Sequence, residues 1–318
     1  MSERDDVADV VVIGGGAAGL SAAVNLGRAR RSVVVVDAGR PRNAPAEGVH
    51  AFLTRDGTPP AELLAAGRAE VERYGGRIVR AAVREAAGTV GDFTVSLDDG
   101  GRVRARRMLL ATGVRDELPD VPGLRARWGR DVVHCPFCHG WEIADRRIGV
   151  VGSPMAVHQA LLFRGWSDDV TLFLRDAIEP SEEEWAKLAA RGIAVVDGAL
   201  AAVEVTGDAV TGVVLADGTV RPVDALVVAP RVHADVVPGL GVAATEHPAG
   251  VGTYVATDQV GATSVPGVWA AGNLADPMAQ VIQAAAAGTR AGAAIVADLL
   301  EEELREALSS ARGLALSP

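Results

Sequence analysis

The sequence predicts an α/β protein with two Rossmann-like, three-layer nucleotide-binding domains, the second inserted into the first. A β-branched run at 9–13 leads into a glycine-rich turn, an Ala-rich helix and a second apolar strand. The same strand, turn, helix and strand pattern returns at 147–174. Proline-rich stretches at 117–123 and 246–252 set this second copy apart from both ends of the chain, as expected for an insertion.

The first glycine-rich turn has the context of a dinucleotide-binding site. Residues 9–13 are predicted as a buried strand, 20–26 as a helix and 32–36 as a second strand. A G-x-G-x-x-G pattern alone is weak, and a strand–turn–helix without a ligand is the alternative. The complete strand–glycine–helix–strand context, closing on an acidic residue, favours the binding site.

Each residue of this pattern has a physical role. Gly14 permits the turn, Gly16 lets the backbone approach a pyrophosphate, and Gly19 allows close packing of helix on strand. Asp37 follows the second strand and is placed to accept hydrogen bonds from ribose hydroxyls.

The second copy keeps only part of the fingerprint. Gly152 matches Gly14, but Pro154 and Val157 stand where the second and third glycines are expected. Proline suits the first turn of a helix, yet its ring replaces the bare backbone that a pyrophosphate must approach. Arg175 takes the place of the acidic residue and is followed by Asp176. We therefore predict a retained fold with weak or absent dinucleotide binding.

The domain prediction follows from these repeats. One domain comprises residues 1–116 and 247–318, and the inserted domain comprises 117–246. A strand is predicted at 108–111 and a long Ala-rich helix at 278–308. The glycines within that helix interrupt its apolar pattern.

A redox motif precedes the second copy. Cys135 and Cys138 are the two cysteines of the chain, flanked by His134 and His139. One helical turn brings such a pair within disulfide distance, and a helix start with nearby imidazoles lowers a thiol pKa. A zinc site would crowd its ligands into one short segment, and haem attachment requires export. Two inert buried cysteines are the remaining alternative.

Composition restricts the function classes. The 318 residues carry a formal net charge of −10, which argues against nucleic-acid binding. An apolar run of about 18 residues, which a membrane span needs, is missing from the sequence. The acidic start runs directly into a strand, so we expect no signal peptide and a cytoplasmic protein.

With these motifs the chain resembles the low-molecular-weight thioredoxin reductase family over nearly its whole length. The resemblance rests on Gly14-x-Gly16-x-x-Gly19, Ala111-Thr112-Gly113, Cys135-x-x-Cys138 before a second βαβ unit, and Gly267-Val268-Trp269-Ala270-Ala271-Gly272. It implies a homodimer that binds FAD in the two-part domain. The resemblance further implies that Cys138 faces the flavin and that Cys135 exchanges with substrate. The implied FAD contacts are Gly14, Gly16, Ala17, Ala18, Gly19, Asp37, Asn43, His50, Thr112, Gly113, Gly272, Asn273 and Gln280.

Several positions depart from the family. In the inserted domain Pro154 disrupts the family's second glycine-rich loop, and Leu174-Arg175-Asp176 replaces its His-Arg-Arg phosphate reader. Asn273 stands where the family has an acid. His139 replaces the Asp that serves as acid–base after the second cysteine. The run Cys-Pro-Phe-Cys-His-Gly-Trp-Glu resembles the FAD-dependent dithiol oxidases that form the disulfides of gliotoxin, holomycin and romidepsin. That branch implies a small-molecule dithiol substrate and O2 as acceptor, with H2O2 as product and no role for NADPH.

We predict that His139 or His134 deprotonates a substrate thiol, which then attacks Cys135. The alternatives left open are an NADPH- or ferredoxin-dependent disulfide reductase and a flavin redox sensor without turnover. The identity of the dithiol is not predicted.

Overall fold

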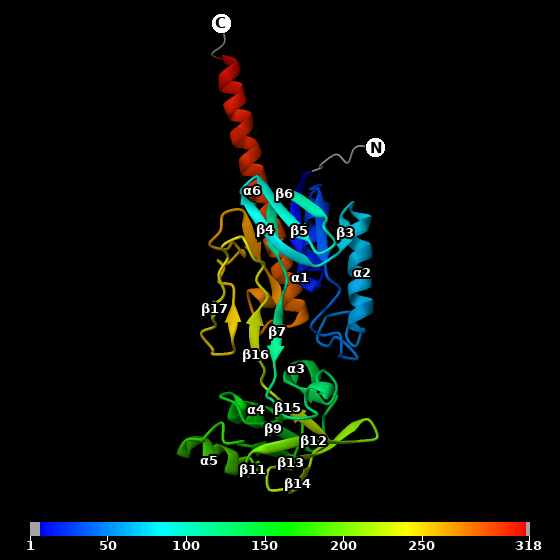
Figure 1. The fold of residues 1–318 in the computed structure, drawn as a ribbon, viewed down its shortest axis with the longest axis vertical. Coiled ribbons are helices and arrows are strands. Elements are labelled where there is room, and N and C mark those ends of the chain that lie inside the picture. Colours follow the sequence, from blue (N-terminus) through cyan, green and yellow to red (C-terminus); the bar gives the residue numbers. More distant parts are fainter. Residues whose placement is uncertain (1–6, 316–318) are drawn as a thin grey trace. The chain divides into compact units, whose positions relative to one another are not determined.

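The computed structural model describes the backbone of residues 7–315 and the side chains of residues 7–311 (Figure 1). Contacts divide the chain into two compact units. The first contains residues 1–42, 61–115 and 232–318, and the second contains 43–60 and 116–231.

The first unit is built on a seven-stranded sheet with the order β3-β2-β1-β6-β5-β4, and β19 pairs with β6. The strands are β1 (Ala8–Ile13), β2 (Val33–Asp37), β3 (Arg77–Arg80), β4 (Val83–Thr89), β5 (Asp92–Leu97), β6 (Arg102–Leu110) and β19 (Val268–Ala270). Strands β3, β2, β1, β6 and β19 are parallel, whereas β5 and β4 continue the sheet as an antiparallel meander. The helices are α1 (Ala17–Arg28), α2 (Pro60–Arg73) and α6 (Val281–Ala315), with a 3-10 turn at Gly272–Leu274.

Alternating side chains of β1 enter two cores. Val10 and Val12 pack with α1 and α6 on one face of the sheet, and Val11 and Ile13 pack with the β4–β5 meander on the other. Burial on both faces explains the continuous apolar run of this strand.

The glycines of α6 allow two helices to approach closely. A Cβ at Gly288 would collide with the carbonyl oxygen of Ala18 in α1, and one at Gly292 would lie 3.1 Å from the carbonyl oxygen of Ala22. These glycines therefore position the start of α1 rather than interrupt α6.

The second unit contains a parallel sheet with the order β11-β10-β9-β15-β8 and an antiparallel sheet with the order β12-β13-β14. The strands are β8 (Val132–Val133), β9 (Ile148–Val151), β10 (Val170–Phe173), β11 (Ala194–Val196), β12 (Leu200–Thr206), β13 (Ala209–Leu215), β14 (Val220–Pro222) and β15 (Ala225–Val227). The helices are α3 (Pro136–His139), α4 (Ala156–Phe163) and α5 (Glu182–Ala190), with a 3-10 turn at Arg125–Arg127. One apolar cluster joins the parallel sheet to α4 and α5, and a second joins its other face to β12 and β13.

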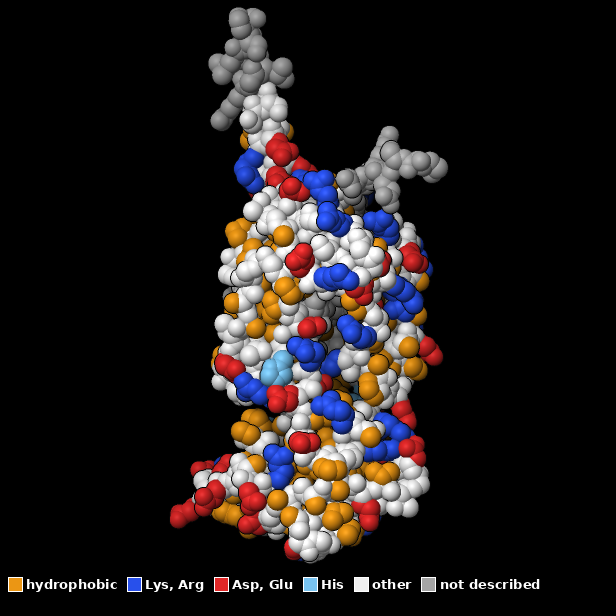
Figure 2. All heavy atoms as spheres, viewed as in Figure 1, with side chains coloured by type: hydrophobic (Ala, Val, Ile, Leu, Met, Phe, Trp, Pro, Cys, Tyr) orange, Lys and Arg blue, Asp and Glu red, His pale blue; other side chains and the backbone are white. Residues whose placement is uncertain are grey.

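Acidic side chains gather at the start of α5. Figure 2 shows them over the edge of the second unit that α5 occupies in Figure 1. Glu184 completes a capping box with Ser181, the residue that precedes the helix. Stabilisation of a helix start accounts for this acidic cluster.

Two pairs of short strands complete the fold: one pair lies at the two points where the chain passes between the units, and the other lies within the first unit. They are β7 (Val114–Glu117), which pairs with β16 (Arg231–Ala234), and β17 (Thr245–Glu246), which pairs with β18 (Thr253–Tyr254). Among the described residues, none of the helices combines the length and the apolar character that a bilayer crossing requires.

The predicted α/β class with two Rossmann-like units is confirmed by the two parallel sheets and their helices. The helix predicted at 278–308 instead spans 281–315: it begins three residues later, and it continues through residues 309–315, which include Gly313. The predicted domain limits stay a prediction. The compact units place 232–246 with the first unit, where Ala86 donates to the carbonyl of Pro238.

Candidate active site

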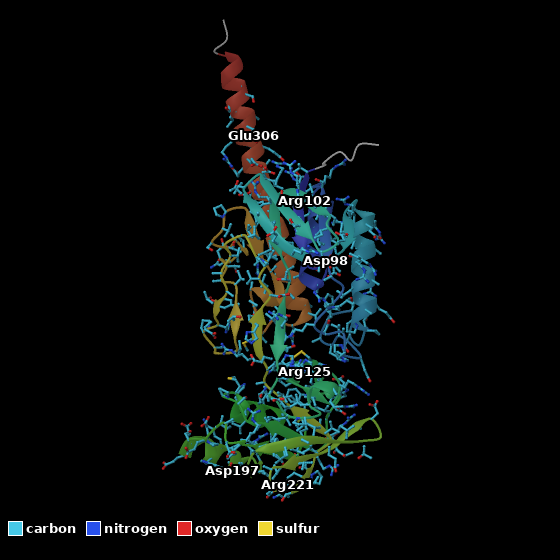
Figure 3. All side chains as sticks on the ribbon, in the orientation of Figure 1. Asp98, Arg102, Arg125, Asp197, Arg221 and Glu306 are labelled. Carbon is cyan, nitrogen blue, oxygen red and sulfur yellow. A yellow bond between two sulfur atoms is a disulfide. The ribbon has the colours of Figure 1, made fainter. Side chains whose placement is uncertain are left out.

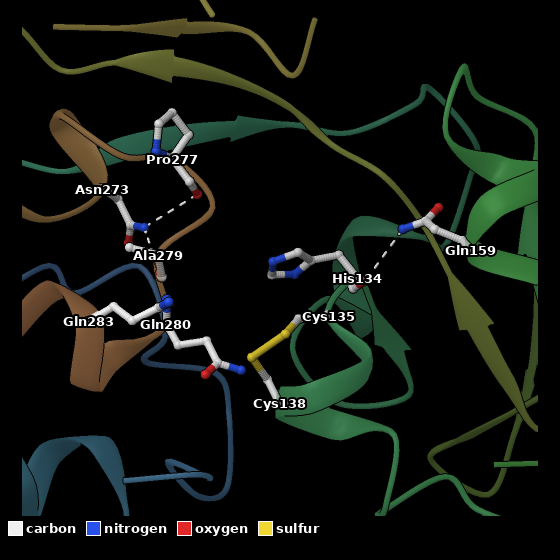
Figure 4. The surroundings of a disulfide bond; sticks show 9 residues. All are labelled: His134, Cys135, Cys138, Gln159, Asn273, Pro277, Ala279, Gln280 and Gln283. Atoms are coloured by element: carbon white, nitrogen blue, oxygen red, sulfur yellow. Dashed lines mark hydrogen bonds between the residues drawn. A yellow bond between two sulfur atoms is a disulfide. The ribbon is translucent and has the colours of Figure 1, made fainter. Parts of the chain in front are cut away.

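The Cys135–Cys138 pair lies at the start of the four-residue helix α3. Cys135 is the N-cap with an extended backbone, and Pro136 occupies the first helical position, where its missing N–H has no cost. The N–H of His139 donates to the carbonyl of Cys135 over 3.1 Å. This single turn brings the two Cα atoms to 5.2 Å, and the cysteines form a disulfide (Figure 4). The predicted pairing of these residues is confirmed.

His139 follows the disulfide and is largely buried. Its Nδ1 and Nε2 atoms are shielded from solvent, and neither has a hydrogen-bond partner. Burial lowers the pKa of His139 below its usual range; the charge of Glu142 raises it, and that of His50 lowers it further. A neutral imidazole with two unused nitrogens beside a disulfide can accept a proton from an incoming thiol.

His134 lies before Cys135 in a different environment. Its ring stacks on Trp128 with centroids 5.6 Å apart. Its backbone carbonyl accepts a hydrogen bond of 3.3 Å from Nε2 of Gln159 (Figure 4). Both contacts fix the segment that carries the cysteines, which favours a positioning role.

The residues after His139 are fixed by packing. A Cβ at Gly140 would lie 2.8 Å from the ring of Trp166, so only glycine fits there without a shift. Phe137 contacts Trp166 edge-on, while 61% of Phe137 and 82% of Trp141 remain exposed. The disulfide segment therefore carries two exposed aromatic side chains.

The segment 43–60 belongs to the same compact unit as the disulfide. Nε2 of His50 lies 3.4 Å from Oε1 of Glu142, and its Nδ1 lies 3.7 Å from Oδ2 of Asp56. Glu142 and Asp56 are not among the site residues expected from the sequence. Glu142 lies three residues after His139, beyond the end of α3, and nothing in the sequence pairs it with His50. The predicted FAD contacts of Asn43 and His50 stay predictions.

The first glycine-rich turn shows why its glycines are required. Gly14 has a φ of +108°, and a Cβ there would collide with the carbonyl oxygen of Ala111. A Cβ at Gly19 would collide with the carbonyl oxygen of Gly14. Gly15 donates its N–H to Oδ1 of Asp37 over 3.1 Å, which fixes the carboxylate beside the turn.

This turn fits the pyrophosphate of FAD. Space above the Cα of Gly16 is open, and Gly16 caps α1 without any side-chain hydrogen bond. The first turn of α1 contains no acidic residue, and its N–H groups lack intrahelical partners. Ala17 and Ala18 begin the helix with small side chains. An anionic group is favoured at such a helix start.

The other predicted FAD residues of the first unit lie on loops after β6 and β19. Thr112 donates its hydroxyl to the carbonyl of Asp235, and Gly113 has a φ of +75°. A Cβ at Gly272 would lie 2.8 Å from the Cβ of Ala18, which places this glycine against the start of α1. The backbone N–H of Gln280 donates to Oε1 of Gln283.

Asn273, which stands where the resembled family has an acid, has a structural role of its own. Its Nδ2 lies 3.3 and 2.9 Å from the carbonyl oxygens of Pro277 and Ala279 (Figure 4). The same atom lies 3.1 Å from the carbonyl oxygen of Asp276. A carboxylate has no hydrogen to donate to these carbonyls. The amide therefore closes the loop before α6.

The second glycine-rich copy keeps its turn, but it does not keep the unobstructed backbone found at Gly16. A Cβ at Gly152 would collide with the carbonyl oxygen of Leu174, so this glycine is required by packing. Pro154 is exposed, and Val157 is buried on α4. Arg175 and Asp176 both adopt left-handed backbone conformations, with φ of 59° and 52°.

Residues 8–291 match the family described as "Pyridine nucleotide-disulphide oxidoreductase". Thioredoxin reductase sirT of Leptosphaeria maculans is 34% identical over 315 residues, which cover 93% of this chain and 95% of that protein. Thioredoxin reductase tcpT of Claviceps purpurea is 36% identical over 178 residues, or 53% of this chain and 56% of that protein.

Solved structures agree with these relatives. The crystal structure of HlmI has a TM-score of 0.89 and 43% identity, and 98% of each chain is covered. An oxidoreductase from Agrobacterium tumefaciens has a TM-score of 0.87 and 41% identity over 92% of this chain and 99% of that chain. The predicted resemblance is confirmed, the chain is an oxidoreductase, and its relatives imply a flavin cofactor.

Proposed function

Because the chain belongs to the pyridine nucleotide-disulphide oxidoreductase family, we propose that it is an FAD-dependent oxidase that forms a disulfide in a small-molecule dithiol. Its terminal acceptor is O2 and its second product is H2O2. The observation that carries the proposal is the Cys135–Cys138 disulfide beside a buried, unpartnered imidazole at His139. The motif shared with dithiol oxidases and the similarity to HlmI support it.

The thiol chemistry uses residues of the second unit. Neutral His139 takes the proton of a substrate thiol, and the thiolate attacks Sγ of Cys135, which releases Cys138 as a thiolate. The second substrate thiol then attacks the substrate sulfur of the mixed disulfide, which breaks the bond to Sγ of Cys135, and its proton passes to the departing Cys135 thiolate. This leaves the substrate oxidised to its disulfide and the cysteine pair reduced by two electrons. When bound, FAD accepts this electron pair and transfers it to O2.

The first unit holds the cofactor in this proposal. The turn Gly14–Gly19 and the start of α1 bind the pyrophosphate, and Asp37, already oriented by Gly15, accepts from the ribose. Thr112, Gly113 and Gly272 contribute the neighbouring loops.

NADPH has no role in the proposed reaction. Pro154 in the second turn removes one N–H donor and adds a ring where a pyrophosphate would approach. The side chain of Asp176 adds a negative charge beside Arg175, which opposes a phosphate.

An anaerobic titration of the FAD-loaded protein tests the proposal. Dithiothreitol is expected to bleach the flavin absorbance, and admission of air is expected to restore it with one H2O2 per dithiol. NADPH at the same concentration is expected to leave the flavin oxidised. Stoichiometric bleaching by NADPH would contradict the oxidase.

A disulfide reductase that takes electrons from NADPH or a ferredoxin is the second candidate. The parallel strands β9 and β10 and the turn at Gly152 are retained, which favours residual nucleotide binding. Absence of bleaching by both reagents, with bleaching by a reduced ferredoxin, would support this candidate. A flavin redox sensor would show no multiple turnover with dithiols.

We also propose a homodimer in the cytoplasm. Leu300, Leu304 and Leu308 recur every four residues on α6 and are 48%, 48% and 60% exposed. From Leu304 to Ala311 every residue of α6 is exposed, and Glu306 marks this part in Figure 3. An apolar stripe of this kind favours a partner, here a second copy. Sedimentation velocity of the FAD-loaded protein measures its oligomeric state.

A further inference from the structure

We propose that α4 and the turn after it support the redox segment, residues 134–145, which carries the disulfide. Gln159 and Trp166 thereby set the equilibrium between the disulfide and the dithiol of the cysteine pair. They are positioning residues that act through the two cysteines. These roles extend beyond the proposed function, because they apply whether the pair passes its electrons to O2 or takes them from a reductant.

Gln159 of α4 holds the start of the redox segment. Its Nε2 atom donates a hydrogen bond of 3.3 Å to the carbonyl oxygen of His134, the residue before Cys135 (Figure 4). A hydrogen bond at this carbonyl restricts the rotation of the peptide that leads into Cys135. The position of the Cys135 backbone therefore depends on α4.

The oxygen of the Gln159 carboxamide points to a specific role for this side chain. Its Oε1 atom is shielded from solvent and has no hydrogen-bond partner among the described residues. A buried acceptor without a partner lowers stability, and an apolar side chain at this position would avoid that cost. The hydrogen bond to His134 therefore gives a reason for a glutamine that stability alone does not favour.

Trp166 holds the same segment beyond the second cysteine. A Cβ at Gly140 would lie 2.8 Å from Cε2 of the Trp166 ring, and Phe137 meets this ring edge-on with centroids 6.0 Å apart. The carbonyl of Trp166 accepts a hydrogen bond of 2.9 Å from the N–H of Asp145, whose backbone is left-handed with a φ of 60°. Three contacts of one residue thus fix the chain after Cys138.

Packing fixes α4 itself. Ala156, Ala160 and Phe163 are fully buried in the apolar cluster of the parallel sheet. The ring centroid of Phe163 lies 5.9 Å from that of Trp166, which continues the packing into the turn after the helix. In an intact dinucleotide-binding unit the start of this helix faces a pyrophosphate, which Pro154 disfavours here. We therefore assign α4 a role toward the disulfide instead.

Holding both sides of the disulfide affects how readily the cysteine pair closes. When the pair is reduced, the two sulfur atoms are no longer bonded, and the backbone alone keeps them close. A segment that is already fixed on either side loses less conformational entropy when the disulfide forms. Weakening either contact should therefore shift the equilibrium toward the dithiol.

The experiment measures this equilibrium with glutathione in the FAD-loaded protein under anaerobic conditions. The protein dithiol and one glutathione disulfide exchange to give the protein disulfide and two glutathione thiols, a transfer of two electrons. The chain contains two cysteines, so alkylation after an acid quench, followed by mass spectrometry, reports on this pair. A series of glutathione ratios gives the equilibrium constant for disulfide formation.

Two variants weaken the support at different points. Gln159→Met removes the hydrogen-bond donor at similar side-chain length, and Trp166→Leu removes the ring. Each should lower the equilibrium constant about threefold to tenfold, which raises the reduction potential by about 15 to 30 mV. Trp166→Phe, which keeps an aromatic ring, should give a smaller change. His158→Ala, at the exposed neighbour of Gln159, is the matched control and should leave the constant unchanged.

Leu188→Ala separates positioning from stability. Leu188 of α5 is buried in the same apolar cluster, so its truncation should lower the Tm and leave the equilibrium constant unchanged. An unchanged constant in both Gln159→Met and Trp166→Leu, or an equal fall in Leu188→Ala, would overturn the inference. If Trp166→Leu does not bind FAD, Gln159→Met and Trp166→Phe decide.

The equilibrium constant is independent of turnover and of the electron acceptor. A flavin that is bleached by NADPH and not by dithiols would reject the proposed oxidase. A fall of the equilibrium constant in the two variants would retain the roles of Gln159 and Trp166 in either case.

Discussion

The two glycine-rich turns of this chain both begin with a glycine that packing requires, and they differ in the space left at the position two residues later. In both, the first glycine is required by the carbonyl of the neighbouring strand end, Ala111 for Gly14 and Leu174 for Gly152. Open space lies above Gly16, whereas Pro154 occupies the matching position. The fold therefore requires the first glycine of each turn, whereas Gly16 leaves the space that a ligand needs.

The third position of the fingerprint sharpens this separation. A Cβ at Gly19 would collide with the carbonyl of Gly14, whereas Val157 is buried on α4 without such a conflict. The first helix therefore packs closer to its turn than the second does. In the first copy, close packing brings the start of the helix toward a pyrophosphate. In the second copy, Val157 replaces the glycine of close packing, and Pro154 replaces the glycine that leaves space for the ligand.

The largest expected effect comes from replacing Gly19 by valine, the residue found at the matching position 157 of the second copy. Gly19→Val forces the side chain into the carbonyl of Gly14, so flavin occupancy should fall about tenfold or more. The ratio of flavin to protein absorbance after purification measures it. Val157→Gly is the matched control and should keep its flavin. Full flavin content in Gly19→Val would show that the close approach is not needed for binding.

A second prediction concerns the thiol chemistry of the second unit and tests His139 as its base. His139→Ala removes the buried base, so anaerobic bleaching by dithiothreitol should slow about 10²-fold while FAD stays bound. Burial holds the pKa of His139 below its usual range, so the wild-type rate should fall as the pH drops below that pKa and be level above it. Stopped-flow absorbance over pH 5 to 9 measures both effects.

His158→Ala is the control for this change, because His158 is an exposed histidine on α4. It should leave the rate and its pH profile unchanged. A pH profile in His139→Ala identical to that of the wild type would remove His139 from the proton transfer.

The smallest expected effect is a gain of NADPH affinity at the second glycine-rich turn. Pro154→Gly restores one N–H and bare backbone, so the affinity for NADPH should rise about threefold to tenfold. Isothermal titration calorimetry with NADPH measures it. Pro222→Gly, at an exposed proline of β14, is the control and should have no effect. Unaltered affinity in Pro154→Gly would place the loss of binding in other residues, such as Asp176.

Local pattern predicted much of this molecule. The strands of both units follow from apolar runs, and each run ends at a glycine, so both features can be read from a few adjacent residues. The turn at Cys135 and Cys138 is equally local, because one helical turn determines the distance between the cysteines. The end of α6 was predicted too early, since the helix continues past Leu308 through Gly313 to Ala315.

The sequence by itself determined the fold class, the redox pair and the family. Tertiary structure decided that both ring nitrogens of His139 are buried, that Asn273 closes a loop with its amide, and that His50 faces Glu142. These facts depend on segments distant in the chain that packing brings together. A pKa depends on burial and on charges within a few ångströms, and neither quantity is encoded by spacing along the chain.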